Sequence, residues 1–171
     1  MCGNLPTDHT GDAKNSTTTT VEEKIKDLGI TLPDVTEPLA SYKLCRRSGN
    51  TLYLSGHLPK AMDGSFSMGK VGTDVTSQYA ESAARLCAIH LIATMKEISG
   101  DLDKIRMVKI TGFVDSGEGF IGQALVVDGA SKLLLEVFGE DKGAHSRSAM
   151  GVRGLPLGVC VEIEAIAEVE S

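Results

Sequence analysis

The sequence has few aromatic residues, no tryptophan and no long apolar run. Three tyrosines and four phenylalanines make up 4% of its 171 residues, which leaves few rings on which exposed bases could stack. Acidic residues outnumber basic ones by 23 to 17, for a net charge of −6, which argues against a nucleic-acid partner. No apolar stretch reaches the roughly 18–20 residues that span a bilayer. No basic patch followed by an apolar stretch opens the chain, so we expect a cytoplasmic protein without a membrane contact.

The cysteines form no recognisable metal-binding or disulfide pattern. The four are Cys2, Cys45, Cys87 and Cys160. None belongs to a C-x-x-C pair, and none lies at zinc-ligand spacing from a histidine. We therefore expect reduced thiols, no metal site and no cofactor.

Composition divides the chain into a tail, a linker segment and one domain. Residues 1–20 are polar and lack apolar periodicity, which predicts a flexible tail to which no function is assigned. Residues 21–40 are expected to form a short helix, Val21–Leu28, and an extended linker marked by prolines. Residues 41–171 are long enough for a single domain with its own core.

Periodicity within the domain predicts the order β-β-α-β-α-β-β. Two long helices on one face of a mixed sheet would make an α+β or α/β sandwich. The predicted elements are a hairpin over Tyr42–Gly56, a helix over Val75–Ser99, a strand over Ile105–Val114, a helix over Gly122–Phe138, and strands over Ser146–Val152 and Val159–Val169.

The last predicted strand has two contrasting faces. Alternation places Val159, Val161, Ile163, Ala165, Ala167 and Val169 on one face, which should pack on the helices. The other face holds Cys160, Glu162, Glu164, Ile166 and Glu168. This second face is either solvated or meets another subunit or a ligand.

Arg147 lies on a strand expected beside the one that carries Glu162. A guanidinium binds a carboxylate through two parallel hydrogen bonds, and a nearby glutamate could position or deprotonate a water. An arginine and a glutamate on adjacent strands also fit a structural ion pair. The residues alone leave both interpretations open.

Two segments resemble the RidA/YjgF family, whose members are also described as L-PSP endoribonucleases or translation inhibitors. Arg147–Ala167 (RSAMGVRGLPLGVCVEIEAIA) resembles the family's C-terminal signature, and Tyr42–Pro59 resembles its N-terminal hairpin with an S-G-Q motif. The pattern GAS…EVFGE…HxRSA within 129–149 is similar to that of a longer branch. The resemblance implies a chorismate-mutase-like α+β sandwich that forms a homotrimer with sites in clefts between subunits.

The resemblance also implies an activity and its residues. Family members hydrolyse reactive enamines and imines, such as 2-aminoacrylate, to 2-keto acids and ammonia. By position, Arg147 would bind the carboxylate of a small metabolite, and Glu162 would hold the attacking water and relay a proton. The other matched pocket positions are Tyr42, Ser55, Gly56, Asp128 and Ala149.

Three matched positions depart from the family pattern, and two histidines lie beside matched motifs. Ala149 stands where the family has cysteine, Asp128 where asparagine is common, and His57 where the S-G-Q motif has glutamine. Asp128 would repel an anionic substrate if it faces the cleft. His57 and His145 are possible contributors to the site.

Three function classes remain open at this point. They are an imine or enamine deaminase, a non-catalytic regulatory module that binds small carboxylates, and an endoribonuclease. Gly117, Gly119 and Gly122 also spell G-x-G-x-x-G between a predicted strand and helix. The strand order and the absence of the crossovers of a six-stranded doubly wound sheet argue against a nucleotide site there.

Overall fold

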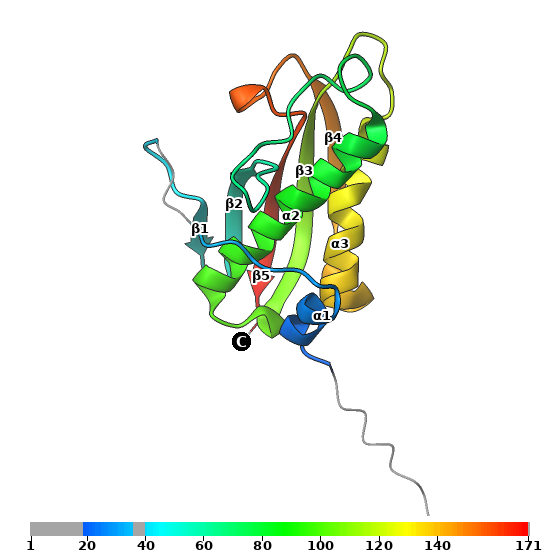
Figure 1. Ribbon diagram of the computed structural model, residues 1–171. Coiled ribbons are helices and arrows are strands. Elements are labelled where there is room, and N and C mark those ends of the chain that lie inside the picture. Colours follow the sequence, from blue (N-terminus) through cyan, green and yellow to red (C-terminus); the bar gives the residue numbers. More distant parts are fainter. Residues whose placement is uncertain (1–18, 36–39, 171) are drawn as a thin grey trace, which may run out of the picture.

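The computed structural model describes residues 19–35 and 40–170, which form a five-stranded mixed sheet with helices on one face (Figure 1). The predicted order of strands and long helices is confirmed, and the predicted tail falls outside the described residues except for its last two positions. The sheet order is β1-β2-β5-β3-β4. The elements are α1 (Val21–Asp27), β1 (Cys45–Ser48), β2 (Thr51–His57), α2 (Ser77–Ser99), β3 (Ile105–Asp115), α3 (Gln123–Gly143), β4 (Ser146–Val152) and β5 (Val161–Val169), with short 3₁₀ turns at Leu102–Lys104 and Pro156–Gly158.

Helix α2 begins and ends where local chemistry requires, whereas α3 starts without a side-chain cap and extends past its predicted end. The Thr76 side chain caps α2 by accepting a hydrogen bond from the Tyr79 amide, and α2 ends at Gly100, which adopts a φ of 72° that favours glycine. The predicted end of α3 at Gly139 is only partly correct. Gly139 leaves helical geometry with a φ of 76°, and helix then resumes as far as Gly143.

Glycines let α3 approach both of its neighbours closely, and Figure 1 shows α2 and α3 side by side over the sheet. A Cβ at Gly129 would lie 1.9 Å from the Glu81 carbonyl oxygen of α2. A Cβ at Gly112 of β3 would lie 2.2 Å from Val127 Cγ2 of α3. Both distances are far below van der Waals contact, so only glycine fits there. These two contacts fix the height and rotation of α3 over the sheet.

Strand β5 has the two faces predicted from its sequence. Its core face is buried against the helices and comprises Val161, Ile163, Ala165, Ala167 and Val169. The opposite face carries Glu162, Glu164 and Ile166, all half-buried, and the exposed Glu168. Cys160, which was expected on this second face, precedes the strand and is wholly buried. No helix in the described part of the chain covers the second face, called here the open face.

Strand β4 does not lie beside β5, contrary to the expectation for Arg147 and Glu162. Strand β3 runs between them, antiparallel to β5 and parallel to β4. A parallel partner requires a crossover connection, and α3 supplies it. Local periodicity locates strands along the chain, but it carries no information about which strand is inserted between two others.

The β3–α3–β4 unit is therefore a parallel crossover that begins with the Gly117–Gly122 loop, but the described sheet has five strands and one parallel strand pair rather than a six-stranded doubly wound order. The loop is also filled by its own side chain. A Cβ at Gly122 would lie 2.8 Å from Phe120 Cζ, and one at Gly72 would lie 2.9 Å from Phe120 Cδ2. The Phe120 ring thus packs where a phosphate would need to approach the backbone.

Candidate functional site

Arg147 lies at the sheet edge, on the side that faces α3. It pairs with Ile110 of β3, and directly opposed residues project their side chains to the same face of a sheet. Its Nη1 donates to Asp128 Oδ1 at 2.5 Å and to Ser131 Oγ at 3.1 Å. Ala149 lies two residues further along on the same face and packs against the core. The predicted residues Arg147, Asp128 and Ala149 are thus brought together by β4 and α3.

A hydrogen-bond relay extends this cluster to His145. The His145 Nδ1 lies 2.6 Å from the Gly143 carbonyl oxygen and must donate to it, because a carbonyl only accepts. In the neutral ring, Nε2 then accepts from the Ser131 hydroxyl, 3.1 Å away. The Ser131 oxygen is left to accept from Arg147. The relay runs from Arg147 through Ser131 to His145.

Ser131 was not among the residues predicted from the sequence. It lies three residues after Asp128 on α3, and residues at this spacing share one helix face. That spacing, beside a predicted Arg147 partner, is the signal that could have found it. We call Arg147, Asp128, Ser131 and His145 the arginine cluster.

Glu162 lies on the open face, next to the space left by the absent side chain of Gly56. It pairs with Phe113 of β3. A Cβ at Gly56 would lie 1.8 Å from Glu162 Oε1, so only glycine leaves room for the carboxylate. Burial raises the pKa of Glu162 above its usual value, and the neighbouring charge of Glu164 adds to the rise. A carboxyl in this setting holds a proton more readily than an exposed one.

Within one chain, Arg147 and Glu162 cannot hold the same small ligand. Arg147 shares its sheet face with Ile110, whereas Glu162 shares the opposite face with Phe113. Adjacent positions on a strand point to opposite faces, so the insertion of β3 and this register separate the pair. The expectation that they lie side by side is wrong, and so is the alternative of a structural ion pair between them.

The remaining predicted pocket residues lie around the end of β2, where Gly56 borders Glu162. Ser55 and Gly56 lie where the register of β2 shifts between Leu54 and His57. The Ser55 hydroxyl donates to the Lys43 carbonyl at 2.8 Å. Tyr42 is half-exposed, and together with Gly56 and His57 it lines a cavity of about 560 Å³ between this hairpin and α2.

His57 is buried, with 6% of its surface exposed, and both ring nitrogens bond to the chain itself. Nδ1 donates to the Ser55 carbonyl at 2.7 Å, and Nε2 lies 2.8 Å from the Thr94 hydroxyl of α2. Burial lowers the pKa of His57 to about 4. The imidazole is therefore neutral at pH 7 and anchors the end of β2 to α2.

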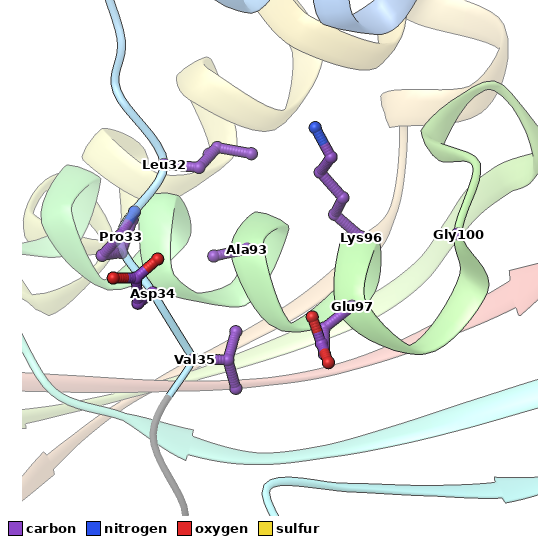
Figure 2. A pocket seen from close by; sticks show the side chains of 8 residues that line it. All are labelled: Leu32, Pro33, Asp34, Val35, Ala93, Lys96, Glu97 and Gly100. Carbon is purple, nitrogen blue, oxygen red and sulfur yellow. The ribbon is translucent and has the colours of Figure 1, made fainter.

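A groove of about 440 Å³ adjoins the cavity of about 560 Å³ and shares Pro33, Asp34, Val35 and Ala93 with it (Figure 2). It runs between the segment 32–35 and the C-terminal half of α2. Figure 2 shows the carboxylates of Asp34 and Glu97 and the ammonium of Lys96 around it. The groove itself contains none of the predicted site residues, but it continues into the cavity that Tyr42, Gly56 and His57 line.

Residues 19–35 and 40–170 contain neither a metal-binding cluster nor a membrane-spanning helix. They contain no cluster of three or more histidine, cysteine, aspartate or glutamate side chains that could hold a metal ion. Their helices are all too short or too polar to cross a membrane.

Comparison with known proteins places this geometry in a family. The family model described as "YjgF/chorismate mutase-like, putative endoribonuclease" matches residues 22–169. The chain belongs to this family, and the resemblance read from its two sequence segments is confirmed. TCP17 from Trypanosoma cruzi is 40% identical over 152 residues, which cover 88% of this chain and 95% of TCP17.

Solved structures confirm the chorismate-mutase-like α+β fold. Protein Atu1372 from Agrobacterium tumefaciens, whose function is unknown, is 44% identical with a TM-score of 0.80, covering 88% of this chain and 94% of its own. A protein from Shewanella oneidensis that carries the same endoribonuclease description is 32% identical with a TM-score of 0.84, covering 88% and 99%.

Proposed function

We propose that this protein hydrolyses 2-imino and 2-enamino acids to 2-keto acids and ammonia, at sites completed by a second copy of the chain. The observation that carries the proposal is the separation of Arg147 and Glu162. Each lies on its own face of the sheet with the polar groups that the chemistry requires, and neither can serve the other's ligand within one chain.

Arg147 supports recognition of a carboxylate. Within the described chain it forms hydrogen bonds through Nη1 alone, so the donors on Nε and Nη2 remain for a ligand. Its side chain is 27% exposed, enough for a small molecule to reach it. Two parallel N–H groups on one planar fork match the two oxygens of a carboxylate.

Glu162 supports the proton transfers. Water adds to the electrophilic iminium carbon while Glu162 accepts a proton from it. The protonated glutamic acid then donates that proton to the nitrogen of the tetrahedral adduct. The carbon–nitrogen bond breaks as Glu162, again a carboxylate, takes the adduct's hydroxyl proton and passes it to water, which leaves a 2-keto acid and ammonia. A glutamate whose pKa is raised by burial suits both steps, because it exchanges protons closer to neutral pH.

A second copy supplies the missing half in this proposal. The family resemblance implies a homotrimer, in which each cleft would combine the arginine cluster of one subunit with Glu162, Gly56, Ser55 and Tyr42 of its neighbour. The open face of β5 supports this arrangement, since half-buried carboxylates and Ile166 lie there without a covering helix in the described chain.

Mixing two inactive variants tests both the residues and the shared site. Arg147→Ala and Glu162→Gln should each lose keto-acid release from freshly generated 2-iminopropionate while the oligomer stays intact. Co-refolded at equal amounts, the two should regain activity in about a quarter of the sites, because some clefts then receive both intact residues. Unchanged turnover in Arg147→Ala would refute the deaminase, and no recovery in the mixture would refute the shared site.

The same preparations separate the two other function classes. Carboxylate binding by calorimetry without any product would favour a regulatory module. Degradation of single-stranded RNA that is lost in both variants, with a chelator control for contaminating nucleases, would favour the endoribonuclease that the family description names. The net charge of −6 argues against the latter outcome.

A further inference from the structure

We infer that Asp128 makes the arginine cluster selective for zwitterions, so that it binds a protonated 2-imino acid and rejects the 2-keto acid anion that hydrolysis produces. The inference rests on the proposed function, because it concerns the substrate class of that same site. The observation behind it is the ion pair between Asp128 and Arg147, in which each partner keeps polar atoms that form no hydrogen bond with the described residues.

The pair is partly exposed and electrically balanced. Asp128 Oδ1 accepts from Arg147 Nη1 at 2.5 Å, and the side chains are 33% and 27% exposed. Asp128 Oδ2 makes no hydrogen bond with the described residues. The cluster therefore offers a ligand both donors, on Nε and Nη2 of Arg147, and one anionic acceptor on Asp128.

Neighbouring charges on α3 are already paired with α2. Lys132 Nζ lies 2.7 Å from Glu81 Oε1, and Glu136 Oε2 lies 2.8 Å from Arg85 Nη1. Opposite charges at these distances largely cancel each other's field at a third group. Asp128 and Arg147 are thus left to determine the charge that a ligand meets at this end of the cleft.

A protonated imino acid complements this pair, and a keto acid does not. The carboxylate of either ligand can accept from the free donors of Arg147. The nitrogen next to that carboxylate carries N–H groups and positive charge in the iminium, so it can donate to Asp128 Oδ2. A keto acid places oxygen lone pairs at the same position, where they meet a carboxylate. Repulsion there would help the product leave after each turnover.

Calorimetry with L-alanine and pyruvate tests the inference without turnover, since the two probes share a carbon skeleton. Wild-type protein should bind the alanine zwitterion more tightly than pyruvate. In Asp128→Asn, which keeps an oxygen acceptor for Arg147, pyruvate should bind about tenfold more tightly because a like charge is gone. Alanine should bind several-fold more weakly, so the preference should reverse.

Two further variants control the experiment. Asp128→Glu retains the charge and should retain the preference for alanine. Asp141→Asn removes a comparable arginine partner, that of Arg106 at 3.1 Å, at the far end of the same helix, and should change neither affinity. Circular dichroism and the oligomer mass show whether each variant remains folded.

The outcomes separate this inference from the proposed function. Parallel changes in both affinities, an unchanged ratio in Asp128→Asn, or no binding of either probe to the wild type would each overturn the inference. A reversed preference in a protein that releases no keto acid would leave the inference standing and refute the deaminase. Keto-acid release together with an unchanged ratio of alanine to pyruvate affinity in Asp128→Asn would support the deaminase and overturn the inference.

Discussion

The arginine cluster and the surroundings of Glu162 are built in opposite ways. Arg147 is held by hydrogen bonds from its own chain, to Asp128 and through Ser131 to His145. Glu162 has no hydrogen-bond partner among the described residues, and its place is created by a missing side chain at Gly56. The arginine cluster is thus a hydrogen-bonded network, whereas Glu162 is a carboxylate that occupies the space left by the absent side chain of Gly56.

This difference suits two different tasks. A group that recognises a fixed carboxylate gains from being held in one orientation, since little ordering is left for the moment of binding. A group that takes up and releases a proton gains from partial burial and from freedom to bond with water in either protonation state. Ligand binding by the arginine cluster should therefore weaken stepwise as single hydrogen bonds are removed. Proton transfer by Glu162 should be lost at once when the space at Gly56 is filled.

The largest effect is expected from Gly56→Ala. The new methyl would overlap Glu162 Oε1 at 1.8 Å, so the carboxylate must swing away. Loss of a positioned acid–base group lowers kcat by about a thousandfold. The protein should remain folded, because the side chain that moves can turn toward the open face. Steady-state kinetics on 2-iminopropionate measure this loss.

Gly154→Ala is the matched control for Gly56→Ala. Nothing lies within 4 Å of a Cβ at Gly154, and its φ is not positive, so activity should be unchanged. Wild-type turnover in Gly56→Ala would mean that the space at Gly56 does not position Glu162 for the reaction.

Elements were predictable from the sequence because their signals are local. Alternation along β5 and the helical spacing in α2 and α3 reflect which face each element buries. The separation of Arg147 from Glu162 was not predictable, because the insertion of β3 between their strands is a long-range event. Ser131 was missed for a related reason, since its role depends on α3 crossing β4 at one height, which Gly129 and Gly112 determine by close contact.

The two histidines near the site differ in burial, although both ring nitrogens of each are hydrogen-bonded within the chain. His57 is a buried anchor with a pKa lowered from 6.5 to about 4, whereas His145 is half-buried and hydrogen-bonded to Ser131. Below pH 6.5 the unfolded chain binds a proton at His57 that the folded one does not. The contribution of His57 to the free energy of unfolding is therefore fully present above pH 6.5. It is lost as the pH drops toward 4, by about 3 kcal/mol in total.

Urea denaturation at pH 7, 5.5 and 4 measures this component of stability. His57→Gln should be less stable than the wild type at pH 7, because the bonds to Thr94 and Ser55 are disturbed. The gap between the two should shrink as the pH falls. A gap that stays constant over this range would show that His57 is accessible to protons in the folded state.

Gly129→Ala should weaken the arginine cluster through the fold. The methyl would clash with the Glu81 backbone, which cannot rotate away as a side chain can. Overpacking of this kind costs about 2 kcal/mol, even after the better helix propensity of alanine is counted. Asp128 and Ser131 flank the clash, so KM should rise as well. Thermal unfolding and KM together distinguish this variant from Gly56→Ala, and wild-type stability would mean that α2 and α3 are free to separate.

A smaller effect is expected from Ser131→Ala. Arg147 would lose one of its two hydrogen-bond partners in the described chain but keep Asp128, so binding of a carboxylate should weaken about tenfold, seen as a higher KM with little change in kcat. Ser131→Thr retains the hydroxyl and should restore most of the affinity. A fall in kcat without a change in KM would mean that Ser131 takes part in the proton transfers.

His145 should act only through Ser131, and a double-mutant cycle can establish this. His145→Asn retains a donor for the Gly143 carbonyl but withdraws the acceptor for Ser131, so KM should rise several-fold. His145→Gln can still reach Ser131 and should have a smaller effect. If the relay is the whole contribution of His145, adding His145→Asn to Ser131→Ala should change KM no further, because the hydroxyl that it orients is already gone. Fully additive effects would instead mean that His145 contacts the ligand directly, and the arginine cluster would then hold two independent recognition groups.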